Sequence, residues 1–465
     1  MEKIKPVSLT KRLFSSIKQY GIAVNEERAI PDYYDGLKPV QRKVLWSMHQ
    51  MGLEANRLVK TARVVGDVLG KFHPHGDKSV QDAITTLVQQ VQAPVFGEGN
   101  WGSITGDKEA AMRYTLVRLS EYGKSFFDPF YLPVLDLVPN YDGSTAEPVR
   151  LTPMLPHLLL NGSSGIGVGA TVEIPAFTKD SVKKVLEQVF AAGKCTVDMC
   201  ANLEIVTPSN ARVLPQKKAL TEFYASRAGS VKFASRLRVT GENVVLTGVA
   251  PFQGVDAYMK QIFGCESLAS VARIQDMSSQ WELSVVFTPR RGVSAEALKD
   301  ELDKRLTSVK HYKVNITKRT LVVKKDGWRE VNVEFQASSI VDIFNRWFTD
   351  RVELEKKALT WQIEQLNAQI RRNEVLILAG KFVDFLFTLA KSKKTNEQCL
   401  RDIEKQLGVS RKEAEFVFEL KWRQLRSIEV SAIGEKIKEQ KSKKAEWEKR
   451  YKNPVPFLIS QLKVL

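Results

Sequence analysis

The sequence predicts a multidomain α+β protein that combines a winged-helix (helix-turn-helix) domain, an α/β domain and a long antiparallel coiled-coil arm with a helical tip. Helical patterns flank a tight glycine-containing turn early in the chain, short β-branched runs fill its middle, and apolar residues recur at three-four spacing towards its end. At 465 residues the chain is too long for one compact core, so several structural units are expected.

The first 125 residues are predicted to be mainly helical. Residues 1–25 hold an amphipathic N-terminal arm, in which Leu13, Ile17 and Tyr20 recur at helical spacing. Residues 26–125 hold three further helical patterns, and the last two, "TARVVGDVLGKF" and "KSVQDAITTLVQQV", are separated only by "HPHGD". This order is typical of a DNA-binding helix-turn-helix unit. The glycine-rich "FGEGNWGSITGD" is expected to form its strand-and-turn wing.

The rest of the chain changes character twice. Residues 126–338 are predicted to form the α/β domain, because β-branched runs such as "WELSVVFTP" alternate with helical pieces. Residues 339–375 and 431–465 are predicted to be the two long helices of the coiled coil. Residues 376–430 between them are expected to form a small helical domain at its tip.

The composition points to a polyanionic partner. The chain has 70 Lys and Arg against 53 Asp and Glu, a formal net charge of +17, so nucleic acid is the first candidate. It has neither an apolar run long enough to span a membrane nor an apolar signal core at its N terminus, so we expect a cytoplasmic protein without a membrane partner. Four scattered cysteines without a CxxC pair argue against a disulfide framework and a zinc site.

The dipeptide Arg113-Tyr114 stands in a stretch of mostly small or apolar residues, "EAAMRYTLVRL". A tyrosine hydroxyl attacks phosphorus only if a neighbour favours its anion and another group absorbs charge on the phosphoryl oxygens. Arg113 could absorb that charge, because a guanidinium binds two phosphate oxygens at once. The alternative is structural: Tyr114 packs in a core while Arg113 forms a surface ion pair. For an isolated dipeptide the structural interpretation is the commoner one, so the context must decide.

Imidazoles and basic side chains surround the predicted turn. His73 and His75 of "HPHG" stand at the entry to the second helix, where phosphate contacts usually occur. A metal pair is disfavoured, because no third ligand follows at a useful spacing. The segment "DGLKPVQRKVLW" supplies Lys38, Arg42 and Lys43 as further candidate DNA contacts.

The segment "NGSSGIGVGATVEIP" is a glycine-rich loop that ends in an Ile-Pro pair. It lacks the lysine of a P-loop and the spacing of GxGxxG, so nucleotide binding is the weaker interpretation. Ile174 could instead be an apolar wedge that opens a base step in DNA. From the sequence alone, burial of Ile174 in a core is about as good an interpretation.

These segments, in this order, resemble the DNA breakage-reunion subunit of bacterial type IIA topoisomerases, the A subunit of gyrase and of topoisomerase IV. The matching stretches cover much of residues 20–176: "RAIPDYYDGLKPVQRKVLWSM", "KTARVVGDVLGKFHPHGDKSVQDAI", "GEGNWGSITGDKEAAMRYT", "VPNYDGS" and "LLLNGSSGIGVGATVEIP". Beyond residue 180 the resemblance is architectural. It implies a tower domain within residues 126–338 and an exit-gate dimerisation domain over 376–430, with "FVFELKWRQLRSIE" similar to the family's last gate.

The resemblance implies a role for each matching residue. Tyr114 matches the tyrosine that attacks a DNA phosphodiester and becomes joined to the 5′ phosphate, while Arg113 and Arg28 match arginines at the scissile phosphate. The remaining matches are residues that line this site or contact DNA, namely His73, His75 and Lys38, together with Ile174 as the isoleucine that intercalates and bends the duplex.

Three departures from the family pattern stand out. Lys78 replaces a small hydroxyl residue, while Asp82 keeps the acidic position one turn later. In the family, the hydroxyl residue and the acid at these two positions resemble a water-mediated anchor for quinolone drugs, so weak fluoroquinolone poisoning is expected here. Gln41 replaces a more usual histidine. The chain stops at Leu465 without the family's DNA-wrapping domain, so relaxation or decatenation is expected rather than negative supercoiling, as in a compact, phage-encoded enzyme.

The resemblance also implies partners, because no ATP site and no acidic metal cluster are visible in the sequence. A B-type subunit is expected to bring the ATPase and a Toprim domain that holds Mg²⁺, which gives an A2B2 assembly on double-stranded DNA. Two copies of this chain are expected to pair through the winged-helix and exit-gate domains, since one Tyr114 cuts one strand. The N-terminal arm is expected to pack on the Toprim domain, within a bacterial cell or a phage-infected host.

Two rival functions remain open. A non-enzymatic helix-turn-helix protein with coiled-coil arms for dimerisation would fit the composition and periodicity nearly as well, and only Arg113 and Tyr114 discriminate against it. A metal-dependent nuclease that uses "HPH" would release free 5′ phosphates and would cut without a partner.

Overall fold

The computed structural model describes most of the chain as two compact units, Met1–Arg351 and Val352–Leu465. The mixed α and β content predicted from the sequence is confirmed. The winged-helix, tower and exit-gate assignments and the six domain boundaries stay predictions. The described residues are 8–54, 57–103, 107–207, 209–249, 260–279, 282–420 and 430–464.

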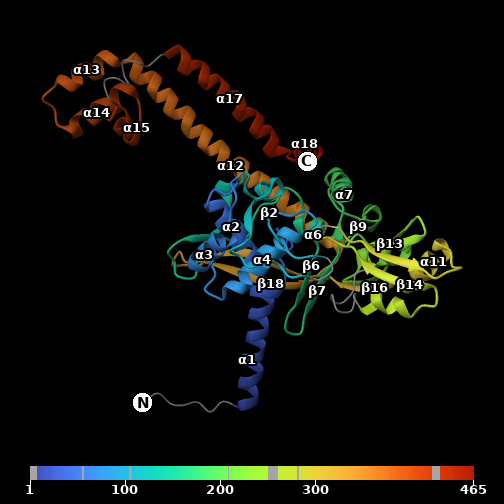
Figure 1. The fold of residues 1–465 in the computed structure, drawn as a ribbon. Helices are drawn as coiled ribbons and strands as arrows, with labels where there is room; N and C mark the ends of the chain where they lie inside the picture. Colours follow the sequence, from blue (N-terminus) through green and yellow to red (C-terminus); the bar gives the residue numbers. More distant parts are fainter. Residues whose placement is uncertain are drawn as a thin grey trace. The chain divides into compact units, whose positions relative to one another are not determined.

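The N-terminal part of the first unit contains helices packed on a small sheet (Figure 1). Its three short strands form an antiparallel sheet in the order β1-β3-β2. The elements are α1 (Leu9–Val24), the π-helical η1 (Asn25–Ala29), α2 (Pro39–Gln50), β1 (Val59–Lys60), α3 (Thr61–Lys71), α4 (Asp77–Gln89), β2 (Val95–Glu98) and β3 (Leu116–Leu119).

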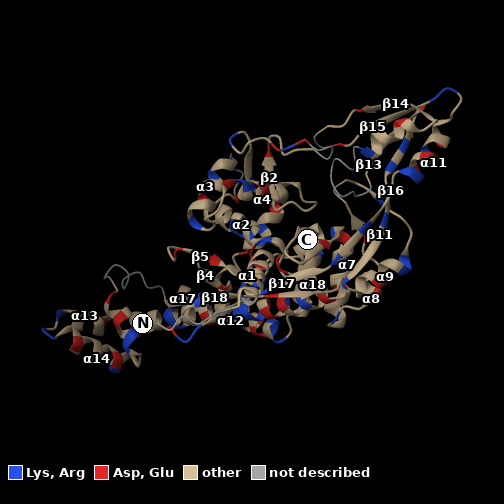
Figure 2. Cartoon of the chain, turned by 90° about the horizontal axis from the view of Figure 1, so that it is seen from below, with Lys and Arg blue, Asp and Glu red and all other residues tan. Residues whose placement is uncertain are grey.

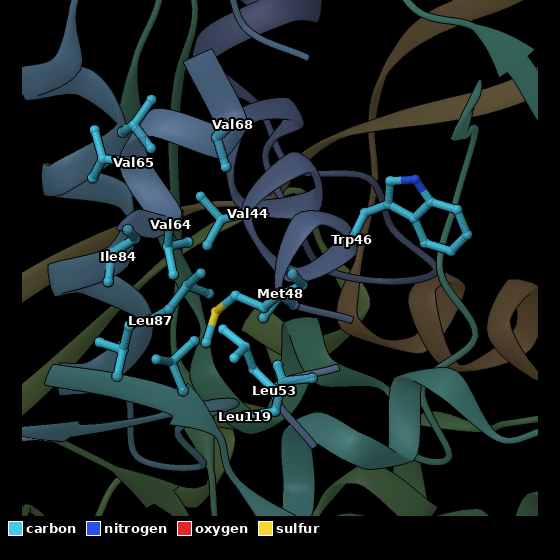
Figure 3. Close-up of a cluster of buried hydrophobic side chains, with 14 of the residues drawn as sticks. Val44, Trp46, Met48, Leu53, Val64, Val65, Val68, Ile84, Leu87 and Leu119 are labelled. Atoms are coloured by element: carbon cyan, nitrogen blue, oxygen red, sulfur yellow. The ribbon is translucent and has the colours of Figure 1, made fainter. Parts of the chain in front are cut away.

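Helices α2, α3 and α4 share one hydrophobic core (Figure 3). Val64 and Val68 of α3 are fully buried and lie four residues apart, and they meet Val44 of α2 and Ile84 of α4. Valine has a low intrinsic helix propensity, so α3 depends on this burial, roughly 1.5–3 kcal/mol per side chain, more than on local preference. The core thus fixes α3, on which the candidate site is built.

The glycine-rich segment after α4 closes this domain through one tight contact. Trp101 is only 2% exposed, and a Cβ atom at position 97 would lie 2.4 Å from its Nε1. Only glycine fits at Gly97, because the indole occupies the space of a side chain. The described part of the predicted wing therefore packs on a buried tryptophan.

The middle of the chain, up to β18, is built from several small sheets. The two largest have the strand orders β10-β11-β16-β7-β6 and β12-β13-β15-β14, and α11 packs on the second. Strands β17 and β18 form a separate antiparallel ribbon that pairs Asn315 with Ala337 and Val323 with Arg329 at its two ends.

These middle elements have the following bounds: α5 (Glu121–Lys124), η2 (Ser125–Phe127), η3 (Leu132–Val134), β4 (Leu137–Pro139), β5 (Ala146–Pro148), α6 (His157–Asn161), β6 (Ser163–Ile166), β7 (Thr171–Ile174), β8 (Ala176–Phe177), α7 (Lys179–Ala192), α8 (Val197–Cys200), β9 (Ile205–Val206), β10 (Arg212–Val213), α9 (Lys217–Ala225), β11 (Ala228–Ala234), β12 (Arg236–Thr240), β13 (Asn243–Gly248), η4 (Gly264–Ser267), β14 (Val271–Asp276), β15 (Val285–Pro289), α11 (Ala295–Arg305), β16 (Thr307–Lys313), β17 (Asn315–Val323) and β18 (Arg329–Ala337).

The second unit pairs two long helices with a small helical cluster (Figure 1). Asn373 of α12 bonds Gln440 of α17 at 3.0 Å, and Glu355 pairs with Arg450, so the two helices run antiparallel. The helix predicted over 339–375 continues to Lys381. Residues 421–429 of the sequence expected to form the last gate lie outside the described part. The elements are α12 (Ile340–Lys381), which begins in the first unit, α13 (Val383–Lys391), α14 (Asn396–Leu407), α15 (Arg411–Phe418), α17 (Val430–Lys452) and α18 (Val455–Val464).

Within the described ranges, no helix combines the length and the apolar character that crossing a membrane requires. Lys and Arg are spread along both units and are not confined to one element (Figure 2). The location of a site therefore has to come from contacts and exposure, not from charge alone.

Candidate functional site

Tyr114 lies on a turn directly before β3 and points its ring into solvent. Its side chain is 63% exposed, and its backbone N–H donates to the carbonyl of Ala111 at 2.8 Å. The guanidinium carbon of Arg113 lies 4.6 Å from the centre of the tyrosine ring. The alternative in which Tyr114 packs in a core is therefore wrong, and a phenol and a guanidinium stand together at the surface.

The turn that carries Tyr114 is anchored on the first residues of α3. The N–H groups of Thr61 and Ala62 donate to the carbonyls of Thr115 and Met112 at 3.0 and 3.2 Å. The hydroxyls of Thr61 and Thr115 are 2.7 Å apart and buried. The first N–H groups of a helix have no partner within it, so the turn supplies the acceptors that α3 needs. Tyr114 is thereby tied to a rigid element.

Helix α4 holds the same segment from its other side through Lys78. The Lys78 ammonium lies 2.6 Å from the carboxylate of Glu109 and 2.7 Å from that of Asp82. The hydrogen bond from Lys78 lowers the pKa of Glu109, and the bonds to both carboxylates raise the pKa of Lys78. Gln81 adds a bond from its amide to the carbonyl of Ala110 at 3.3 Å. The residue that departs from the family pattern thus bridges α4 and the tyrosine segment.

A second group of predicted residues gathers around the turn between α3 and α4. The rings of His73 and His75 lie 4.6 Å apart, and His73 Nε2 lies 3.2 Å from the hydroxyl of Ser79. Burial, followed by the positive charges of His75, Lys43 and Arg28, lowers the pKa of His73 to about 4. His73 is therefore neutral at pH 7, and the groups around it create a positive potential that suits a phosphate backbone.

Lys38 joins α2 to the glycine-rich hairpin. Its ammonium donates to the carbonyl of Ser164 at 2.7 Å, and its backbone N–H donates to the side-chain oxygen of Gln41 at 3.0 Å. Burial lowers the pKa of Lys38, and the nearby carboxylate of Glu173 opposes this change. Gln41, which replaces the histidine expected from the family, thus caps the first turn of α2.

Comparison with known proteins gives this arrangement a context. The sequence profile for the A subunit of DNA gyrase/topoisomerase IV matches residues 28–463, nearly the whole chain. The chain belongs to this family. It is 30% identical to the A subunit of DNA topoisomerase 4 from Salmonella typhimurium over 429 residues, which cover 89% of this chain and 55% of that protein.

Two gyrase A subunits show similar likeness. The one from Clostridium acetobutylicum is 26% identical over 450 residues, covering 94% of this chain and 53% of the relative. The one from Helicobacter pylori is 28% identical over 448 residues, covering 93% and 52%. The chain therefore spans about half the length of these members of the gyrase and topoisomerase IV A-subunit family.

Two predicted DNA contacts of this family member, Arg42 and Lys43, have partners within the protein. Arg42 is 4% exposed, and its guanidinium donates to both oxygens of Asp35 at 2.6 and 2.9 Å. Lys43 donates to the carbonyl of Phe72 at 2.6 Å and lies 3.5 Å from Glu147. The interpretation of Arg42 as a phosphate contact is therefore corrected, because its guanidinium is buried against Asp35. The side chain of Lys43 is 23% exposed, so its contact with DNA stays a prediction.

The wedge predicted at Ile174 is also corrected. Ile174 ends β7 and is 3% exposed, so it cannot enter a base step, whereas Ile166 at the end of β6 is 86% exposed. The sequence did carry a signal for Ile166, which stands between two glycines in the loop, while Ile174 closes a run of strand-forming residues. In this hairpin Ile166 is more exposed than Val168, which is 39% exposed, and is therefore the better placed of the two for contact with a ligand.

A metal site does not emerge in this part of the family fold as described. Within residues 8–464, excluding the undescribed gaps, no three or more His, Cys, Asp and Glu side chains are grouped so that they could hold an ion.

Replacement of Arg42 by methionine should strongly destabilise the first unit. Burial by itself raises the pKa of Asp35, but the charge and hydrogen bonds of Arg42 outweigh it, so Asp35 stays ionised in the interior. Without Arg42 this charge has no counter-ion, which costs about 3–5 kcal/mol. Urea unfolding should show the loss in Arg42→Met, partial recovery in Asp35→Asn/Arg42→Met, and little change in the exposed control Lys60→Met. Equal unfolding midpoints for the two single variants would contradict this assignment.

Proposed function

We propose that the chain is the DNA cleavage and religation subunit of a type IIA topoisomerase. The observation that carries the proposal is the exposed phenol of Tyr114 beside the Arg113 guanidinium, on a turn anchored to α3. A solvent-facing tyrosine held by buried hydrogen bonds is accessible to a duplex yet fixed in position, as a nucleophile must be. Family membership supports the same assignment.

The proposed reaction exchanges one phosphate ester for another. The Tyr114 oxygen loses its proton and bonds to phosphorus, and the bond from phosphorus to the 3′ oxygen breaks, so that oxygen takes up a proton. The 5′ phosphate stays on the tyrosine, and religation is the reverse step. Arg113, with Arg28, stabilises the negative charge that builds up on the phosphoryl oxygens.

The turn between α3 and α4 is the second part of the proposed DNA interface. In this proposal α2 to α4 and the sheet β1-β3-β2 form the winged-helix domain, with His75, His73 and Lys38 lining the scissile phosphate. The positive groups around His73 agree with that role. Ile166 takes over the wedge role that the sequence placed at Ile174, because its side chain is free to reach a base step.

The proposed enzyme needs other chains. Two copies of this chain would cut the two strands and meet through the winged-helix and exit-gate domains. A B-type subunit would bring ATP hydrolysis and the Toprim domain, whose Mg²⁺ would stabilise oxygens at the scissile phosphate. The described residues of this chain hold no group of three or more possible metal ligands. Relaxation or decatenation in the bacterial cytoplasm or in a phage-infected cell is the proposed activity.

Helix α1 fits the proposed contact with that partner. Leu13, Ile17 and Tyr20 lie on one stripe of the helix and are 52%, 58% and 65% exposed. A stripe of exposed apolar residues at spacings of three and four is typical of a helix that packs on another surface. We assign that surface to the Toprim domain of the B-type subunit.

Tyr114→Phe should abolish covalent linkage to DNA but leave DNA binding intact. The assay combines the chain with a B-type subunit from the same source, plasmid DNA and Mg²⁺, and a detergent quench reveals protein-linked DNA. Loss of the nucleophile should reduce this product by about a thousandfold or more. Tyr451→Phe, at another exposed tyrosine, is the matched control. If Tyr114→Phe still forms the covalent product the proposal is wrong, and if wild type only binds DNA the non-enzymatic rival is favoured.

Ile166→Ala should reduce DNA bending more than DNA binding. The bend is measured by energy transfer between dyes at the two ends of a short duplex. A wedge that unstacks a base step is worth a few kcal/mol, so the bent population should fall about tenfold or more. Val168→Ala, in the same hairpin and partly exposed, is the control. An unchanged bend in Ile166→Ala would remove Ile166 from the interface.

Lys78→Ser should increase sensitivity to fluoroquinolones. Asp82 matches the acid of the family's drug anchor, and its carboxylate forms an ion pair with the Lys78 ammonium at 2.7 Å. With serine there, the drug concentration for half-maximal stabilised cleavage should fall by about tenfold. Lys108→Ser, at a neighbouring exposed lysine, controls for lost charge. A Lys78→Ser enzyme that cleaves normally but gains no sensitivity would contradict the idea.

A further inference from the structure

The loop between β4 and β5 carries the segment "NYDGS", which matches the family but has no role in the site described above. Its first two side chains reach the end of α3. The Asn140 amide donates to the carbonyl of Lys71 at 2.5 Å, and the Tyr141 hydroxyl donates to the carbonyl of Gly70 at 3.1 Å. With the bond from Lys43 to Phe72, three consecutive carbonyls accept from side chains outside the helix.

The end of an α-helix needs such donors. The last four carbonyls of a helix have no intrahelical partner, and many helices satisfy them with a glycine in the left-handed region. Helix α3 has no such glycine at its end: Phe72 has φ −128°, and the N–H groups of Phe72 and His73 both donate to Val68 at 2.9 Å. The following carbonyls therefore depend on Tyr141, Asn140 and Lys43.

The donor loop is itself rigid. The Asn140 side-chain oxygen accepts from the N–H of Thr145 at 3.3 Å, and the Asn140 backbone N–H donates to the Thr145 carbonyl at 2.9 Å. Asp142 accepts from the N–H of Ser144 at 2.9 Å, and Gly143 supplies a positive φ of 73°. Asn140 is 6% exposed, so its amide is fixed and shielded from water.

The segment held by these donors leads directly into the histidine turn. His73 follows Phe72, and the N–H of His75 donates to the His73 carbonyl at 2.8 Å. On the other side, the Ser79 hydroxyl lies 3.2 Å from His73 and donates to the carbonyl of Gly76 at 2.7 Å. The turn is thus fixed at its start by the "NYDGS" loop and at its end by α4.

We infer that Asn140 and Tyr141 are positioning residues that, with Lys43, fix the C-terminal end of α3 and so set the place of His73 and His75 on DNA. The link to DNA rests on the proposed function, whereas the link to the histidine turn does not. Neither residue touches the reacting atoms in this scheme; both act through the backbone of α3.

The first test measures the histidine turn without DNA. Asn140→Asp keeps the acceptor for Thr145 but cannot donate to Lys71, and Tyr141→Phe removes only the hydroxyl. The chain has five histidines, so imidazole resonances can be assigned by single substitutions and titrated by NMR. In Tyr141→Phe, which adds no charge, release of the turn should decrease the burial of His73, and its pKa should rise from about 4 towards that of an exposed imidazole. The carboxylate of Asn140→Asp would raise this pKa further. Tyr451→Phe should leave it unchanged.

The second test uses the cleavage assay with the B-type subunit. We expect the covalent DNA product per folded protein to fall about tenfold in Asn140→Asp and roughly threefold in Tyr141→Phe. A merely structural role would lower the midpoint and leave the cleavage of folded protein unchanged, and that result overturns the inference. So does an unshifted His73 in both variants. If instead wild type forms no covalent product while His73 shifts, the proposed function fails and the positioning of the turn stands.

Discussion

The fold of the first unit depends on the buried ion pair between Asp35 and Arg42. Asp35 is fully buried and accepts from Nε and Nη2 of Arg42, from the N–H of Leu37 and from that of Leu151. An unpaired charge in this place would be very costly, so the pair forces α2 and the strand-rich middle of the chain into one arrangement. Asp32 makes the same kind of link, since it accepts from the N–H of Arg319 on β17.

Helix α3 belongs to the same unit and is hydrogen-bonded to other segments at both of its ends. Its first N–H groups satisfy the carbonyls of the segment that carries Tyr114, and its last carbonyls satisfy donors of the β4–β5 loop. The candidate nucleophile and the histidine turn are therefore linked through one rigid helix of eleven residues. In the proposed reaction, the length of α3 sets the distance between Tyr114, which attacks phosphorus, and the histidines that contact the DNA backbone.

Much of this could be predicted from the sequence, and the failures have one cause. The helical pattern of "TARVVGDVLGKF" predicted α3, and the order of the segments led to the family and to Tyr114. Arg42 and Ile174 were misplaced because a local pattern shows that a side chain is basic or apolar but not which other element covers it. Burial is decided by partners from other parts of the fold, here Asp35 with Leu151 for Arg42. The two isoleucines lie at opposite ends of one hairpin, where Ile174 pairs with Ser163 and Ile166 with Thr171.

The exposed stripe of α1 has a practical consequence for anyone who handles the protein. Leu9 and Phe14 extend the stripe and are 75% and 71% exposed, so a chain purified alone exposes a contiguous apolar surface to solvent. Without the proposed partner subunit, such a helix is expected to bury this surface by self-association. We therefore expect yield and solubility to improve on co-expression with the protein that covers α1. Light scattering of the free chain would report self-association, and its loss on addition of a candidate partner would identify a protein that binds α1.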